Sequence, residues 1–168
     1  MKRSAVMVVG LLVASVGLAP RAGADDGGRP SRVSGAIEFA DPVVSPLSCD
    51  AALHCVVGLS ATNQWSGGLQ GTSSSREIIA VDQTTGWATF ESFELFTGHV
   101  QGCGDGSFTM RGSISRSFPS PGTGTLEVLP GTGSGDLAGV RGRGTFSVTP
   151  TGPTSATSTF VLDLRCRD

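Results

Sequence analysis

One carboxylate stands out because aromatic residues flank it at alternating positions. The stretch WATFESFELFTGHV alternates apolar and polar residues and predicts a β-strand with Phe90, Glu94 and Phe96 on one face. If that face is buried, desolvation raises the pKa of Glu94 and suits its carboxyl group to general acid–base catalysis. The alternative is structural: Glu94 lies in water at the edge of the fold, or it pairs with an arginine such as Arg111 or Arg76.

The other reactive side chains lack the partners that their chemistry requires. His54 and His99 are the only histidines, and both are expected near strand ends, where the fold separates them. The cysteines are spaced as C-x5-C followed by two isolated residues, without the C-x-x-C pairs of a zinc site. Serines are frequent, but no G-x-S-x-G sequence marks a nucleophile elbow. We therefore expect no metal ion and no cofactor.

A glycine-rich segment fits a nucleotide-binding pattern. Residues 133–138, GSGDLA, match G-x-G-x-x-A, which binds a dinucleotide only where a helix begins on its last residues. Here three more glycines follow, and a new strand pattern begins at Thr145. A P-loop would need a lysine, and Lys2 is the only lysine of the chain. The glycines are better explained as turn residues that tolerate positive φ.

The N-terminal segment has the features of a secretory signal peptide. Two basic residues precede the apolar run Ala5–Ala19, and residues 22–24, AGA, form an A-x-A cleavage site. We expect cleavage before Asp25, which removes residues 1–24 and leaves a secreted, extracellular protein without a membrane anchor.

The exported part of the chain is acidic. Cleavage removes three of the twelve basic residues and none of the fourteen acidic ones, which leaves a net charge of about −5. No basic patch interleaved with aromatic residues remains, so the composition argues against a nucleic-acid partner. A lysine-free acidic surface also argues against docking on anionic lipid.

Short strand patterns fill most of the remaining sequence, and helix signals are nearly absent. The patterns cover Val33–Phe39, Cys55–Trp65, Gly68–Val81, Trp87–Val100, Gly104–Ser115, Gly122–Leu129, Gly142–Thr149 and Thr157–Cys166. About eight successive strands with short links predict an all-β fold, a closed antiparallel up-and-down barrel, because closure removes exposed edges. We expect one barrel domain over residues 33–168, preceded by a flexible tail over residues 25–32.

All four cysteines lie in the exported part, where an oxidising compartment favours two disulfides. Counting alone allows three pairings, but strand direction in the barrel selects one. Cys49 and Cys55 share the first connection at one end, whereas Cys103 and Cys166 lie at the other end. A strand of about ten residues separates the ends by roughly 20 Å, far beyond the reach of a disulfide. We therefore expect Cys49–Cys55 and Cys103–Cys166.

The glycine-rich blocks carry a family resemblance. The stretch FELFTGHVQGCGDGSFTMRGSI, followed by GTGTLEVLPGTGSGDLAGVRGRGTF, resembles a family of uncharacterised bacterial proteins grouped with the allene oxide cyclase barrel. Members carry V-x-P-G-S-G-T-G-x-L-x-G-L-x-G-x-G-T-F, which corresponds here to Leu129–Phe146. The match covers roughly Trp65–Leu164 and implies an eight-stranded calycin-like barrel, in agreement with the strand count. No catalytic residues are assigned in this family. The four cysteines set this chain apart from members that have simpler sequences.

If the face that carries Glu94 is the interior of such a barrel, its carboxyl group lies among aromatic side chains. We expect this residue to share a ligand pocket with large side chains of the same face, Phe90, Phe96, Phe108, Met110 and Phe146. Allene oxide cyclase and its barrel relatives act on apolar ligands inside the barrel. The resemblance thus implies either a binder of a small hydrophobic ligand or a cofactor-free cyclase or isomerase, in which Glu94 is the candidate catalytic residue.

The alternative function is a secreted structural or interaction barrel whose core is filled and takes no ligand, since eight strands leave room for side chains or for one small molecule. Barrel relatives form trimers, so by analogy we also expect a homo-oligomer.

Overall fold

The computed structural model describes residues 29–151 and 156–166, and the regular structure of these residues consists of β-strands. The predicted signal peptide, its cleavage site and the first residues of the predicted tail lie outside the described residues. None of the residues in the described ranges forms a helix long and apolar enough to span a membrane.

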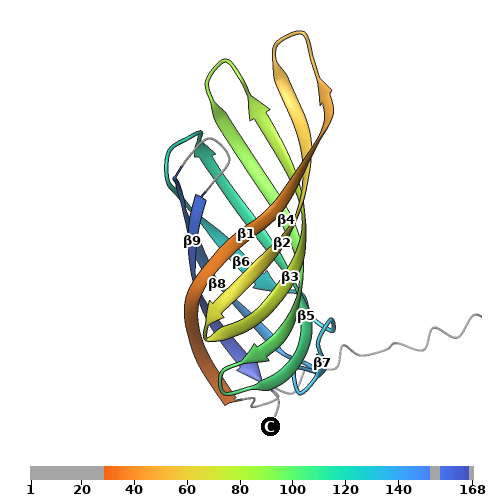
Figure 1. The fold of residues 1–168 in the computed structure, drawn as a ribbon, viewed down its shortest axis with the longest axis vertical. Coiled ribbons are helices and arrows are strands. Elements are labelled where there is room, and N and C mark those ends of the chain that lie inside the picture. The colour runs from red at the N-terminus through yellow and green to blue at the C-terminus, as the bar shows by residue number, and fades with distance from the viewer. Residues whose placement is uncertain (1–28, 152–155, 167–168) are drawn as a thin grey trace, which may run out of the picture.

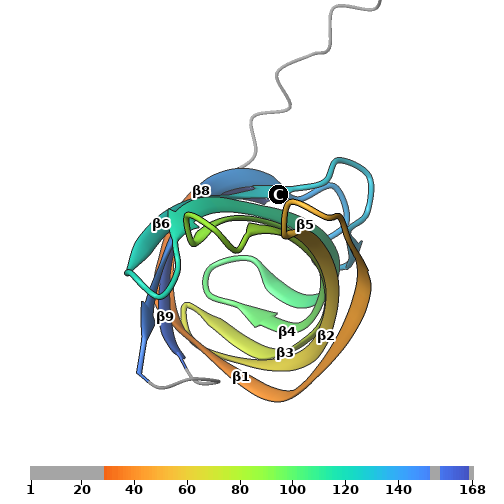
Figure 2. The same cartoon turned by 90° about the horizontal axis from the view of Figure 1, so that it is seen from above.

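Eight long strands form one closed ring (Figures 1 and 2). Each strand pairs antiparallel with its neighbours in the chain, β4 pairs with β5, and β1 pairs with β9 to close the barrel. The remaining strand, β7, is a two-residue segment that pairs with the edge of β5. This arrangement confirms the predicted up-and-down barrel. The strands are β1 (Arg29–Cys49), β2 (His54–Gly67), β3 (Leu69–Asp82), β4 (Trp87–Val100), β5 (Gly104–Ser117), β6 (Gly122–Val128), β7 (Ser134–Gly135), β8 (Arg141–Pro150) and β9 (Ala156–Cys166).

The first strand is much longer than the sequence pattern predicted. It begins at Arg29, so residues 29–32, expected in the tail, pair with β9. It also continues past Phe39 through Pro42 and Pro46, which interrupt the alternation of apolar and polar residues. Beyond Ile37, β1 pairs with β2 alone, and two register shifts occur in this part. Proline is tolerated on such a bulged edge because no second neighbour needs its missing N–H.

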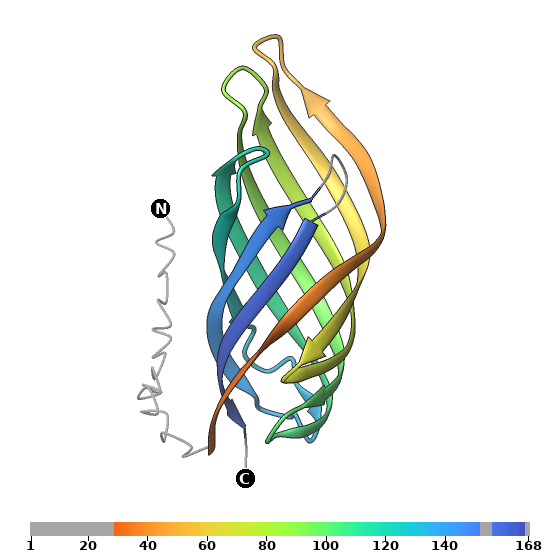
Figure 3. The same ribbon diagram turned by 60° about the vertical axis from the view of Figure 1, so that its left-hand side comes forward.

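The connections divide the barrel into two ends. The upper end, at the top of Figure 1, holds the turns β1–β2, β3–β4, β5–β6 and the connection from β8 toward β9. The lower end holds the turns β2–β3 and β4–β5 and the long connection from β6 to β8. Figure 3 shows the hairpins β1–β2 and β3–β4 rising above the other strands at the upper end. The two ends differ in how their interiors are filled.

The glycine-rich connection between β6 and β8 closes the lower end. Three of its glycines, Gly131, Gly135 and Gly139, adopt positive φ, as turn residues do. The Asp136 amide donates to the Asp105 carbonyl at 2.8 Å. Leu137 and Val140 are buried in the barrel core. The segment is therefore a structural connection between antiparallel strands, as its lack of a following helix predicted.

Two disulfides connect the pairs that strand direction predicted. Cys49 and Cys55 join the two strands of the first hairpin at the upper end. Cys103, which follows β4, is bonded to Cys166 at the end of β9, with 5.5 Å between the Cα atoms. The second bond ties the lower turn of β4–β5 to the last strand of the barrel.

Candidate functional site

The interior of the upper half is a cavity of about 490 Å³. Its wall is mostly apolar and is formed by residues from all eight long strands and by Phe118 of the β5–β6 turn. These residues include Ile37, Phe39, Leu59, Ala61, Ile79, Phe90, Ile114, Leu126, Phe146 and Val148. Gly112 on β5 also lines the cavity, and a Cβ atom placed there would lie 2.5 Å from Ser92 Oγ, so its missing side chain makes room for that hydroxyl group. A space of this size and lining can hold one small organic molecule.

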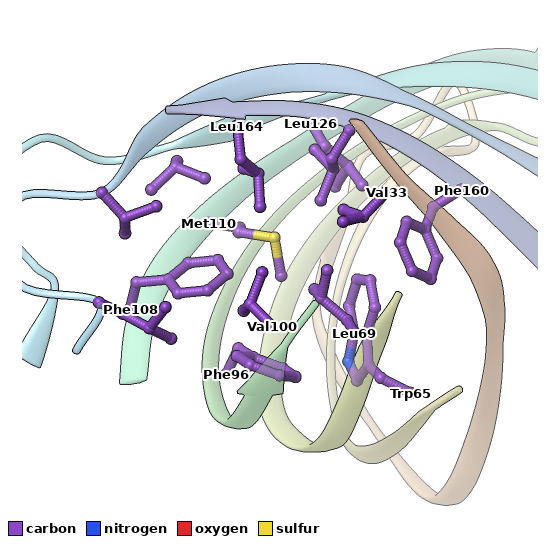
Figure 4. Packing of buried hydrophobic residues seen from close by; sticks show 14 of the residues in the cluster. Val33, Trp65, Leu69, Phe96, Val100, Phe108, Met110, Leu126, Phe160 and Leu164 are labelled. Carbon is purple, nitrogen blue, oxygen red and sulfur yellow. The ribbon is translucent and has the colours of Figure 1, made fainter. Parts of the chain in front are cut away.

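A packed core fills the lower half and forms the floor of the cavity (Figure 4). Trp65 contacts Phe160 and Phe96 edge-on, with ring centroids 5.0 Å and 6.1 Å apart, and Phe96 lies 5.1 Å from Phe108. Leu69 and Val100, at the lower ends of β3 and β4, are fully buried. No space for a ligand is expected among these contacts, because interiors of this kind are close-packed.

The six residues predicted to line the pocket divide between these two regions. Phe90, Glu94 and Phe146 line the cavity. Phe96, Phe108 and Met110 are fully buried in the packed core and are absent from the cavity wall. All six point inward as predicted. The second three lie lower along their strands, in the core beneath the cavity.

Glu94 is held by a polar network at the base of the cavity. Its Oε2 atom accepts hydrogen bonds from Ser73 Oγ at 2.8 Å and from Asn63 Nδ2 at 3.2 Å. Trp65 Nε1 in turn donates to Ser73 Oγ at 2.8 Å, which links the network to the core. The residue is only 6% exposed, and burial raises the pKa of its carboxyl group despite the two hydrogen bonds. Its other oxygen, Oε1, is free to face a ligand as a donor when protonated.

The two arginines considered as partners of Glu94 both lie on the outer surface of the barrel. Arg111 Nη2 lies 2.9 Å from Glu91 Oε2, and this pair sits on the outer surface. Arg76 is exposed and points away from the interior on β3. Asn63, by contrast, is fully buried, and its Oδ1 atom has no hydrogen-bond partner. The neighbours of Glu94 are thus neutral polar groups, which leave its charge uncompensated and favour the protonated form.

A second carboxylate, Glu77, also lines the cavity and was not predicted from the sequence. It lies on β3 opposite Ser92, one inward position above the pair of Ser75 and Glu94. Burial, together with the nearby Glu94, raises the pKa of Glu77 to about 7. The sequence does predict that Glu77 points inward, because it lies two residues before Ile79 and so on the same face of the strand.

One cation, Arg116, lines the cavity near its upper end. It is 9% exposed, and its guanidinium lies 5.3 Å from the ring centres of Phe90 and Phe118. Its Nη1 atom donates to the carbonyl oxygen of Ser120. Burial lowers the pKa of Arg116, but a guanidinium remains charged at any physiological pH.

The remaining candidate residues lie away from the cavity wall. His54 pairs with Asp50 at 3.0 Å at the upper end, and His99 pairs with Asp105 at 2.9 Å near the lower end. The two histidines therefore occupy opposite ends of the barrel. Within the described ranges, no three metal-ligating side chains come together.

The comparisons with known proteins agree with this architecture. A family model described as "Protein of unknown function (DUF3224)" matches residues 48–160. A crystal structure of a DUF3224 protein of unknown function from Shewanella oneidensis MR-1 matches with a TM-score of 0.61 and 19% sequence identity. That match covers 83% of this chain and 99% of the other, and at this identity it supports the fold alone. No curated protein matches the sequence.

Proposed function

We propose that this chain, which belongs to the DUF3224 family of proteins of unknown function, is a secreted barrel that binds a small, mainly apolar molecule in its upper cavity. The observation that carries the proposal is the cavity of about 490 Å³ above a closed, packed floor. Ligand sites in proteins commonly have volumes of about 300–1,000 Å³, with apolar walls and a few polar groups that orient the ligand.

The chemistry of the wall fits such a ligand. Phe39, Phe90 and Phe146 present aromatic rings, and aliphatic side chains from several strands complete the surface. Burying apolar ligand surface here would contribute about 25 cal/mol per Å² before the costs of association. The carboxyl groups of Glu77 and Glu94 and the guanidinium of Arg116 supply the polar contacts that fix its orientation.

The alternative function, a structural barrel with a filled core, accounts for the lower half only. There, Phe96, Phe108 and Phe160 are fully or almost fully buried and stabilise the fold. In the upper half, two carboxyl groups and a buried cation occupy positions where apolar side chains would pack better. A barrel that served only as a scaffold would gain nothing from these costly groups.

Secretion is part of the proposal and rests on two features. The N-terminal sequence has the pattern of a cleavable signal peptide. All four cysteines form disulfides, which persist in oxidising compartments outside the cytoplasm.

A second candidate function, a cofactor-free cyclase or isomerase, is favoured by the two carboxyl groups on one wall. The pKa of Glu77 is raised to about 7, and that of Glu94 is also raised. A neutral carboxylic acid beside a group that titrates near neutral pH is a pattern seen in acid–base catalysis. The resemblance to the allene oxide cyclase barrel points to the same reaction class. A Glu94→Gln variant that binds ligand normally but loses any turnover found would support this candidate.

Binding is tested with a neutral apolar fluorescent probe, N-phenyl-1-naphthylamine, and with two matched variants. Ala61 lines the cavity on β2, whereas Ala80 is exposed on the outer face of β3. We expect Ala61→Phe to weaken probe binding by roughly tenfold or more, because the new ring occupies the space of the ligand. Ala80→Phe should bind the probe as the parent does. A parent that binds no probe, or two variants that bind it equally, would contradict the proposal.

A further inference from the structure

Arg116 places a buried positive charge on the cavity wall without an acidic partner among the described residues. Among the residues that the structure describes, the guanidinium makes one hydrogen bond, which Nη1 donates to the Ser120 carbonyl oxygen. Its Nε atom is buried and has no hydrogen-bond partner. The rings of Phe90 and Phe118 lie at cation–π distance and compensate part of the charge. A charge without an acidic partner is costly in such a place, and an anion bound at the Nη atoms would compensate it.

The two carboxylates of the cavity do not fill this role. No ion pair within 4.0 Å joins Arg116 to Glu77 or to Glu94 in the described part of the chain. Glu94 is bonded to Ser73 and Asn63 instead. Burial raises the pKa of both carboxyl groups, to about 7 in Glu77, and so favours their neutral forms, in which they carry no negative charge. The three ionisable groups that line the cavity then sum to a net positive charge.

The position of Arg116 indicates which part of a ligand it would contact. It stands one residue before the end of β5, beside Phe118 of the upper turn. Leu126 and Phe146 line the cavity from the middle of β6 and β8 and contribute no charge. The cavity is thus positive near its upper end and apolar along the side formed by Leu126 and Phe146, which is the polarity of an amphiphile.

We propose that the cavity takes an amphiphile with a single anionic headgroup, which binds the Nη atoms of Arg116 while the apolar part lies against Phe146 and Leu126. This inference rests on the proposed binding function and adds the class of ligand. The planar fork of a guanidinium matches a carboxylate in a two-point contact, so a carboxylate or a similar oxyanion suits the headgroup.

The test compares three ligands that share one chain and differ in the headgroup: decanoate, decanol and decylamine. Calorimetric titrations at about pH 6 keep decanoate ionised and Glu77 neutral. The parent should bind decanoate roughly tenfold or more tighter than decanol, since desolvated charge pairs have effects of this size. Decylamine should bind most weakly.

Three variants assign the preference to Arg116. Arg116→Gln should abolish the preference for decanoate while decanol binding stays within about twofold, and Arg116→Lys should keep much of it because the charge remains. Arg143→Gln, which removes an exposed arginine from β8, should behave as the parent does. Melting curves confirm that each variant is folded. If Arg116→Gln does not fold, the parent's headgroup preference and the Lys variant decide the question.

The outcomes separate this inference from the binding function. Equal affinities for decanoate and decanol in the parent, or a preference that survives Arg116→Gln, would overturn the inference and leave ligand binding in place. Equal loss of both ligands in Arg116→Gln would assign Arg116 a structural role and also overturn it. A parent that binds none of the three ligands, nor the neutral naphthylamine probe, would overturn the binding function itself.

Discussion

Two glutamates share one cavity, Glu94 buried and Glu77 partly buried, and their contacts give them different properties. Glu94 has one oxygen bonded to Ser73 and Asn63, whereas no hydrogen bond is found for the Glu77 carboxyl group among the described residues. Burial raises the pKa of both, and in Glu77 the raised value is about 7. The aromatic residues around Glu94 singled it out in the sequence but left open whether it is buried or lies in water at the edge of the fold. Glu77 was harder to single out, because neighbouring serines make that strand polar on both faces.

The raised pKa of Glu77 predicts a dependence of stability on pH. The native state keeps its proton up to about pH 7, whereas the unfolded chain releases it near pH 4.5, the ordinary value. The native state therefore binds more protons between these values, so its free energy of unfolding falls as the pH rises from about 4.5 to 7. Glu77→Gln should remove this loss, with a gain over the parent of up to about 3 kcal/mol above pH 7.

Urea unfolding of parent and variant across this pH range measures the effect. Glu127→Gln, which replaces an exposed glutamate of β6, serves as the control. A gain that is constant with pH, or one that grows toward acid, would show that Glu77 is not buried in the way described here.

The pattern of each strand predicted which side chains point inward but not how deep they lie. Phe90 and Phe96 lie on the same face of β4, yet Phe90 lines the cavity and Phe96 belongs to the packed core. Six residues of a strand span roughly 20 Å, so the two rings lie at different heights. Height depends on the register with neighbouring strands and on where the connections close the interior. The burial of Leu137 from the β6–β8 connection, which helps to seal the lower end, was not readable from alternation.

Strand direction did suffice to predict the disulfides, because it decides at which end each cysteine lies. The Cys103–Cys166 bond spans 63 positions of the sequence, and the Cys49–Cys55 bond spans six. By the chain-entropy estimate, the longer loop should contribute about 4 kcal/mol to stability and the shorter about 2 kcal/mol.

Paired replacements test this difference. Cys103→Ala with Cys166→Ala should lower the free energy of unfolding more than Cys49→Ala with Cys55→Ala. Denaturant unfolding of the two double variants gives the comparison directly. An equal loss in both, or a larger loss for the hairpin bond, would mean that loop length does not govern the contribution of these bonds.

On the scale of the whole molecule, the barrel divides its tasks between its two halves. The lower half holds the aromatic core, the long-range disulfide and the β6–β8 connection, and it stabilises the fold. The upper half holds the cavity, its two carboxyl groups and one cation, and it can accept a ligand at little cost to the core. The closed barrel was predictable because regular strands without helices have few other stable arrangements. The cavity was not, since it depends on which inward positions carry small residues such as Ala61.

The central claim is that a small molecule occupies the upper cavity, and the most direct measurement is a crystal structure of the protein soaked with bromine-labelled decanoate. Anomalous scattering locates the bromine independently of any assumption about the pose. The account predicts one bromine peak inside the barrel, near Phe146 and Leu126, with the carboxylate at Arg116. A bromine peak only on the outer surface, or an upper half closed by its own side chains, would contradict the claim.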